Sequence, residues 1–522
     1  MLRCESRDAA PWRPNRDMSA GMAAIGRPAR VRPTCVCRFS SGADPDLFDI
    51  RQLRNKLIIA VTESSVAQRW SCFEWASVIL VCGYWSMTRS FAHLGVAPLY
   101  VGEAFLLAVA VFRSSALQGV WIHHLTRRTA MTALSVLLTV SLCFGVLQSL
   151  RGIIEQHNTK IALQNLAFHV YPLLFFPGVY LGIARPDMLP RAARWAAWTV
   201  GLYGAAYIAI LSPLGLAEGG ALVGDDENAV AWAGQPSGAG PALLAVAAFA
   251  PSAARAAIPL ALNAFVVLGI QVRAIWMALA VAFPLWGFLT GKLRVVLAAV
   301  ATATVVLAVA WVLDVRIPAP TGRGGEISAR GIVGRALSAV SPELAQQYIP
   351  DPERYATTVS WRTQWWRALW QVVHRDQWWT LVGPGYGYPI WSHHPEGDFD
   401  VPLRTPHNVF VYALSYTGWV GVALFAAVQA ALAAVLWKAY RVSGQPFGFC
   451  YWVIVIIWAT FDNFLESPQG AVPFYLLAGM AAAAVLRPSP PRDRTNDVAH
   501  SPSSPQDNES PQSGSHRREQ RL

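Results

Sequence analysis

The chain has 522 residues, of which 54% are hydrophobic and only 14% are charged, and its mean hydropathy is +0.34. A soluble domain carries about 25% charged residues, so this composition excludes an ordinary soluble enzyme and a disordered scaffold. The net charge of +11 does not indicate nucleic-acid binding. Its basic residues gather in the two tails and in alternate short loops, as in a membrane protein whose topology they set.

The two ends of the chain differ from the rest in composition. Residues 1–69 are basic and contain no long apolar run or signal peptide, and they predict a disordered cytoplasmic extension. Residues 487–522 are rich in Ser, Pro and charge, and they predict a disordered cytoplasmic tail. The region between them, 70–486, is expected to be one polytopic membrane domain.

Long windows without a charge recur through this domain. A transmembrane helix needs about 20 apolar residues. The sequence therefore predicts an all-α polytopic membrane protein with about twelve transmembrane helices, of which the sixth and seventh are short enough to form one re-entrant pair. The expected spans are 71–90, 96–112, 129–150, 161–184, 192–214, 238–251, 256–271, 274–290, 294–313, 408–436, 447–463 and 469–486.

Loop charges predict the orientation of these spans. Arg127, Arg128, Arg255 and Lys292 fall in loops on one side, and acidic residues such as Asp462 fall in loops on the other. By the positive-inside rule both termini are cytoplasmic, at the cytoplasmic (inner) membrane. One large loop, 314–407, then lies outside the membrane as an extracytoplasmic loop. Long loops of this kind are usually functional.

Two charged residues lie in or near predicted spans. Glu103 falls inside the second span, where a carboxylate indicates either function or helix pairing. Arg273 lies at the outer boundary of two apolar segments. It could extend to lipid headgroups, or it could clamp a phosphate with its two-pronged guanidinium.

The outer loop contains a segment of helical period, Ser360 to Trp370. Trp361, Trp365 and Leu369 share one stripe, and Arg362, Trp366 and Trp370 share the neighbouring one. The segment could lie on the outer leaflet as an interfacial helix. It could also direct an Arg inward as an anion clamp and offer Trp365 and Trp366 as stacking faces for sugars.

Two further loop motifs give weaker indications. The run Gly383-Pro384-Gly385-Tyr386-Gly387-Tyr388-Pro389 is expected to be a tight turn, because no strand precedes it as in a nucleotide-binding loop. His393 and His394 precede Glu396, Asp398 and Asp400, but their spacing matches no standard metal site, so no metal site is predicted.

The most informative stretch begins at Arg404-Thr405-Pro406-His407-Asn408. Thr405 is a plausible N-cap and Pro406 suits the first helical position, which would place His407 and Asn408 in the first turn. A helix N-terminus favours an anionic group such as a diphosphate and disfavours a protonated imidazole. His407 would then be neutral and able to act as a base. The alternative is an interfacial His with Asn408 as a secondary cap.

Together these residues resemble the O-antigen ligase and O-antigen polymerase superfamily. The resemblance rests on Thr-Pro-His-Asn before Gly418-Trp419-Val420-Gly421, on Arg273-Ala274 with Trp276, on Arg362 with Trp365, and on the glycine-rich turn. It covers roughly residues 70–486. The family often has an acidic residue near Ser415–Thr417, and this chain has none there.

The resemblance implies a GT-C-like, metal-independent, inverting glycosyltransferase without a cofactor. Its partners would be a glycan on undecaprenyl diphosphate, a lipid or glycan acceptor such as lipid A core, and membrane lipids, with no nucleic acid. His407 would deprotonate the acceptor hydroxyl and Asn408 would orient His407 or the substrate. Arg273 and Arg362 would hold the diphosphate, with Arg367 in place of Arg362 if the alignment shifts by one turn.

Other functions remain open at this point. A polymerase of the same superfamily, or a protein O-glycosyltransferase, would use the same Arg and His residues. A transporter of a lipid-linked saccharide would place charges at the membrane midplane and would often show internal repeats. Here Glu103 stands almost alone at such a depth, and no repeat is visible.

Overall fold

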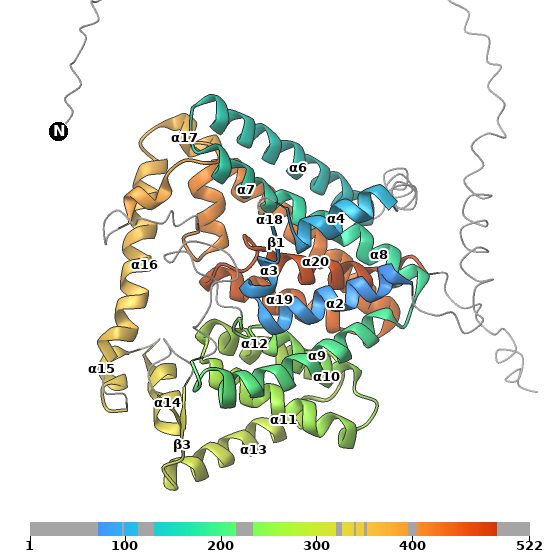
Figure 1. Ribbon diagram of the computed structural model, residues 1–522, viewed down its shortest axis with the longest axis vertical. Helices are drawn as coiled ribbons and strands as arrows, with labels where there is room; N and C mark the ends of the chain where they lie inside the picture. The colour runs from blue at the N-terminus through green and yellow to red at the C-terminus, as the bar shows by residue number, and fades with distance from the viewer. Residues whose placement is uncertain are drawn as a thin grey trace, which may run out of the picture. The chain divides into compact units, whose positions relative to one another are not determined.

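The computed structural model describes residues 71–96, 99–112, 130–215, 233–319, 326–338, 341–348, 352–394 and 405–487, and these are mostly helical (Figure 1). The predicted disordered extensions 1–69 and 487–522 lie outside the described residues, apart from Arg487. A helix lies in each segment where a span is predicted. The helices of the membrane domain are α2 (Cys72–Met87), α3 (Arg89–Ala92), α4 (Val101–Phe112), α6 (Ala130–Ile154), α7 (Thr159–Val170), α8 (Phe175–Ala184), α9 (Met188–Ala206), α10 (Ala239–Phe249), α11 (Ala253–Ile270), α12 (Arg273–Leu289), α13 (Leu293–Val312), α18 (Val409–Ser443), α19 (Phe447–Phe461) and α20 (Pro468–Ala482).

Six helices in the described part of the chain are long and apolar enough to cross a membrane. They are Met131–Ile154, Thr159–Ala184, Ala253–Ile270, Leu293–Val312, Val409–Ser443 and Pro468–Val485. Others, including α2, α4, α10, α12 and α19, are apolar but shorter. The chain is therefore a helical membrane protein, whereas the number of twelve crossings stays a prediction.

The expectation of an all-α fold misses two small hairpins. Strand β1 (Gly95–Val96) pairs with β2 (Leu99–Tyr100), and β3 (Arg316–Pro318) pairs antiparallel with β4 (Glu326–Ser328). These strands have two or three residues each, too short to show an alternating pattern in a sequence.

Glycine-mediated contacts hold the C-terminal helices together. A Cβ on Gly178 of α8 would lie within 3.0 Å of the Cα of its partner Gly479 of α20, and one on Gly479 within 2.9 Å of the Cα of Gly178. Small residues let membrane helices approach this closely. The resulting van der Waals contacts hold the helices together, because there is no hydrophobic driving force for their association in lipid. Glu103 of α4 accepts a hydrogen bond from the hydroxyl of Tyr171, between α7 and α8, a contact that agrees with the helix-pairing alternative.

Helix α13 behaves differently from its neighbours. Of its residues only Val296 is buried, although the helix is strongly apolar. It lies at the edge of the helix assembly next to α12 and α14 (Figure 1). A helix that is apolar all round and exposed suits a lipid environment.

The long connection between α13 and α18 is itself folded. Its described helices are α14 (Ala329–Leu337), α15 (Pro342–Ala345), α16 (Pro352–Val373) and α17 (Gln377–Val382), followed by a 3-10 turn at Ile390–His393. Helix α16 covers the segment of helical period in the sequence, so that prediction is confirmed. In Figure 1 it runs along the side of the helix assembly, beyond the ends of α18 and α19.

Candidate functional site

The inner stripe of α16 packs into the protein. Trp365 has no exposed surface, Leu369 is 1% exposed, and the indole N–H of Trp365 donates to the carbonyl of Ile390 at 3.1 Å. A side chain buried in this way cannot stack against a sugar, so the expected role of Trp365 is at odds with the structure. Its stripe anchors α16 to the loop that follows.

The neighbouring stripe connects α16 to two other segments. Arg362 Nη1 donates to the carbonyl of Phe461 at 2.8 Å, at the end of α19. The indole N–H of Trp366 donates to the carbonyl of Pro406 at 2.7 Å, directly before His407. Trp366 thus holds the segment before His407 through its N–H, and because the side chain is only half-buried, its role as a stacking face stays a prediction.

Arg367 lies on the outer side of α16. It is exposed. Within the described residues, no contact joins Arg367 to the end of α19 or to the segment before His407. The geometry therefore favours Arg362 over Arg367 as the arginine of the site.

The start of α18 differs from the prediction. Asn408, not Thr405, is the N-cap, and its side-chain oxygen accepts from the backbone N–H groups of Phe410 and Val411 at 2.9 and 3.1 Å. Asn is among the strongest N-cap residues, and it competes successfully with Thr405. His407 is consequently outside the helix and has a left-handed backbone with φ of 55°.

His407 faces a carboxylate from a distant part of the chain. Its Nδ1 lies 3.2 Å from Oδ1 of Asp462, the residue that ends α19. The side chains are 26% and 32% exposed, so the pair remains accessible to a substrate. The ring of Trp361 lies edge-on to that of His407 with centroids 5.8 Å apart.

The surroundings of Asp462 favour its ionised form. Burial by itself would raise the pKa of Asp462, but the hydrogen bond with His407, the charges of His407 and Arg362, and the N–H of Asn463 together lower it to about 2. A carboxylate that stays charged at neutral pH can orient the imidazole and stabilise an imidazolium. This is the arrangement of a base held by an acidic partner.

Arg273 begins α12 and lies at the same end of the membrane domain. Its Nη1 donates to the hydroxyl of Ser338 at 3.1 Å, at the end of α14. At the opposite end of the same helices, Tyr440 of α18 donates to the carbonyl of Leu289 at 3.0 Å. Helix α12 also packs against α19, which ends at Asp462. No direct contact between Arg273 and His407 or Arg362 appears in the described segments.

The glycine-rich turn supports α18. Gly383, Gly385 and Gly387 have φ of 73°, 94° and 85°, which only glycine adopts readily. Gly418 interrupts α18 with φ of 61°, and the N–H of Gly385 donates to the carbonyl of Tyr416 at 3.0 Å beside this interruption. The predicted tight turn is confirmed, and its task is to cover the kink in α18.

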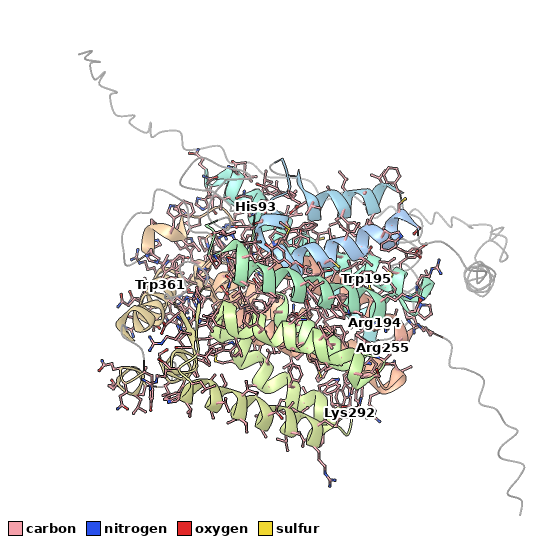
Figure 2. The ribbon with its side chains drawn as sticks, turned by 60° about the horizontal axis from the view of Figure 1, so that its bottom comes forward. His93, Arg194, Trp195, Arg255, Lys292 and Trp361 are labelled. Atoms are coloured by element: carbon pink, nitrogen blue, oxygen red, sulfur yellow. The ribbon has the colours of Figure 1, made fainter. Side chains whose placement is uncertain are left out.

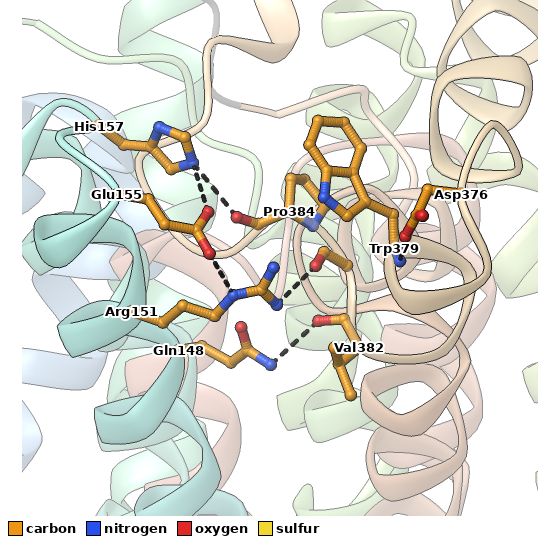
Figure 3. A network of polar contacts seen from close by, with 9 residues as sticks. Gln148, Arg151, Glu155, His157, Asp376, Trp379, Val382 and Pro384 are labelled. Atoms are coloured by element: carbon orange, nitrogen blue, oxygen red, sulfur yellow. Dashed lines mark hydrogen bonds and ion pairs between the residues drawn. The ribbon is translucent and has the colours of Figure 1, made fainter. Parts of the chain in front are cut away.

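Side chains from α6 and the residues after it hold the same turn (Figure 3). Arg151 Nη1 donates to the carbonyl of Gly383 at 2.7 Å, and Gln148 Nε2 donates to that of Val382 at 3.0 Å. Arg151 also pairs with Glu155 at 2.6 Å. His157 Nε2 lies 3.2 Å from the carbonyl of Pro384. Backbone carbonyls point to these donors, so the turn offers no cradle for a phosphate here.

The His393–His394 pair has other contacts. His393 Nε2 lies 3.0 Å from the hydroxyl of Tyr388. His394 is 6% exposed and packs against Trp361 and Trp365 with centroids 5.1 and 4.9 Å apart. Glu396, Asp398 and Asp400, the carboxylates considered with them, lie outside the described residues.

Sequence reasoning missed Asp462 as a site residue. It appears there only as one acid in an outer loop, more than fifty positions from His407. Two signals could have found it, namely its position at the end of the predicted span 447–463 and its predicted location on the same side of the membrane as His407.

A sequence model of the family described as O-antigen ligase matches residues 258–426. No curated protein matches the chain. The matched segment contains Arg273, α16, the glycine-rich turn and the His407–Asn408 start of α18. The chain is a helical membrane protein, and its residues 258–426 are similar to the O-antigen ligase family.

Proposed function

We propose that this protein is a GT-C-like inverting glycosyltransferase, which moves a glycan from undecaprenyl diphosphate to an acceptor hydroxyl on the outer face of the cytoplasmic membrane. The pairing of His407 with Asp462 beside Arg362 is the observation that carries the proposal. An accessible base, an anionic partner and an arginine are the groups that such a transfer requires.

In the proposed mechanism each ring nitrogen of His407 has its own task. Nδ1–H donates to Asp462, which leaves Nε2 as the acceptor for the proton of the attacking hydroxyl. The oxygen then attacks the anomeric carbon while the bond to the diphosphate breaks, which inverts the configuration. Asp462 stabilises the imidazolium that forms.

The leaving diphosphate needs positive charge. Arg362 lies beside Asp462, and Arg273 begins α12 at the same end of the domain. A guanidinium binds two phosphate oxygens at once, so two arginines can neutralise the diphosphate as it leaves. The proposal therefore routes no step through a metal or a cofactor.

The decisive experiment is an assay of purified full-length protein with an undecaprenyl-diphosphate glycan and a lipid A core acceptor. We expect His407→Ala to lower the rate about 10²–10⁴-fold, the usual contribution of a general base. Asp462→Asn should cost up to about 10⁴-fold, because an amide can hold the imidazole in the wrong tautomer. His374→Ala, an exposed histidine at the end of α16, is the matched control and should retain activity.

Full activity of His407→Ala would refute the mechanism. Mass spectrometry of undecaprenyl-linked saccharides in cells that lack the gene distinguishes a ligase from a polymerase. Long polymers left on the lipid indicate a ligase, whereas accumulated single repeat units indicate a polymerase. An unchanged lipid-linked pool would favour transport of a saccharide instead.

A further inference from the structure

A cavity of about 670 Å³ opens between α9, α10 and α11. Arg194 and Arg255 line it together with an apolar wall that includes Trp198, Val246, Ile258 and Pro259. Its volume is in the range of small-molecule and lipid sites in proteins. None of the residues discussed above for glycan transfer lines it.

The two arginines have no carboxylate partner among the described residues. Arg194 Nη1 donates to the carbonyl of Phe249 at 3.2 Å, which leaves the other N–H groups of its guanidinium available. Arg255 is exposed in the first turn of α11, where Ser252 caps the helix. Two cations therefore border an apolar groove, and no acidic side chain in the described part of the chain neutralises them.

The groove lies at the far end of α11 from the candidate site. The helix has 18 residues, or about 27 Å at 1.5 Å per residue, and Arg255 and Arg273 lie at opposite ends of it. Figure 2 shows Arg194 and Arg255 next to each other, on the opposite side of the view from Trp361. For a helix that crosses the bilayer, this position is the opposite membrane surface.

We propose that this groove binds an anionic phospholipid of the leaflet opposite the glycan-transfer site. The phosphate lies between Arg194 and Arg255, and an acyl chain follows the wall formed by Val246, Ile258 and Pro259. Trp198 and Ile258, which are 37% and 60% exposed, extend the apolar surface beside the opening. Basic pockets between membrane helices recognise anionic headgroups in this way, whereas free phosphate would leave the apolar wall unused.

The test measures lipid retained by the full-length protein. Purified protein is titrated with phosphatidylglycerol or phosphatidylcholine, and bound lipids are counted by native mass spectrometry. We expect Arg194→Gln/Arg255→Gln to weaken phosphatidylglycerol binding by about 10-fold or more. The matched control is Arg191→Gln/Lys292→Gln, which removes the same charge at two positions outside the lining and should bind as the wild type does.

A second pair of variants separates the groove from general surface attraction. Ala254→Trp fills the groove and keeps both arginines, and it should also lose bound phosphatidylglycerol. Ala257→Trp, at an exposed position of α11 outside the lining, should not. Ala254→Trp also tests the proposal if the double arginine variant fails to fold.

Three results would overturn the proposal. The first is equal retention of the anionic and the neutral lipid by the wild type. The second is an equal loss in the two double variants, which would mean that net charge alone acts. The third is inorganic phosphate binding with no lipid binding, which would assign the arginines to a soluble anion.

Discussion

His407 has a backbone conformation that non-glycine residues adopt at a cost of about 1–3 kcal/mol. Trp366 holds the preceding carbonyl and Asn408 caps the helix that follows, so both neighbours fix this conformation. The result is an imidazole that points to Asp462 instead of lying along the first turn of α18. Strain of this kind is typical of functional positions, and it supports the proposed role of His407.

Arg362 and Arg367 allow a matched comparison at the residue scale. We expect Arg362→Lys to reduce glycan transfer by about 10-fold or more, because a point charge replaces the planar fork that binds two oxygens. Arg367→Lys should leave the rate nearly unchanged, since Arg367 is exposed on the other side of the same helix. Equal losses in the two variants, measured as kcat/KM for the lipid-linked donor, would place the diphosphate elsewhere.

Glu466 leads to a prediction about pH and stability. The residue is 8% exposed, and its oxygens have no hydrogen-bond partner in the described part of the chain. Burial first, and then the charge of Asp462, raise the pKa of Glu466 to about 8 despite nearby backbone N–H groups. Its folded-state pKa therefore lies above the ordinary value of 4.5.

The sign of the effect follows from proton binding. Between about pH 4.5 and 8 the unfolded carboxyl has lost its proton while the folded one keeps it, so stability falls as pH rises through this window. We expect Glu466→Gln to raise the free energy of unfolding by about 2–4 kcal/mol near pH 8 and to change it little near pH 4. Thermal unfolding of the purified protein at both pH values provides the measurement, and equal shifts at both would contradict it.

At the scale of elements, the kink in α18 depends on one glycine. A Cβ at Gly418 would lie 2.6 Å from the backbone N of Gly383 and from the backbone of Leu381, at a φ of 61°. The glycine-rich turn, held by Arg151 and Gln148 of α6, leaves no space for it. Loss of this contact would move the start of α18 relative to α16.

We therefore expect Gly418→Ala to destabilise the protein by about 3 kcal/mol or more, since a steric clash adds to the cost of the left-handed conformation. Gly444→Ala is the matched control. Gly444 also has a positive φ, 71°, but open space surrounds its Cβ position, so about 1 kcal/mol is expected. Thermal unfolding midpoints of both variants test this, and similar midpoints would show that the turn can move away.

At the scale of the whole molecule, the two proposed sites lie at opposite ends of α11. The candidate glycan-transfer site lies beyond one end of the membrane helices, and the Arg194–Arg255 groove lies at the other. Orientation in the cell follows from loop charge alone and stays a prediction.

Labelling of single cysteines tests this orientation. In a variant without the native cysteines, Ser360→Cys on α16 should react with a membrane-impermeant maleimide added to intact spheroplasts. Ser252→Cys, the exposed N-cap of α11, should react only after permeabilisation. The opposite pattern would invert the topology, and labelling of both in intact spheroplasts would mean that the chain crosses the bilayer an even number of times between Ser252 and Ser360.

The sequence by itself determined the class of protein and the positions of its helices, because apolar length and loop charge are local properties of the chain. It also indicated His407, Arg273 and Arg362, since each stands out against an apolar background. Local pattern could not choose between Thr405 and Asn408 as the N-cap, because both residue types suit that position.

Only the tertiary structure decided which side chains meet. Asp462 reaches His407 because the end of α19 lies beside the start of α18, and no pattern within either segment encodes that contact. The extent of burial likewise distinguishes Trp365 from Trp366, and Arg362 from Arg367. The two members of each pair are the same type of residue, and they differ only in the face of α16 that they occupy. Chemistry at this site depends on distances of a few ångströms between segments far apart in the chain, and packing alone sets those distances.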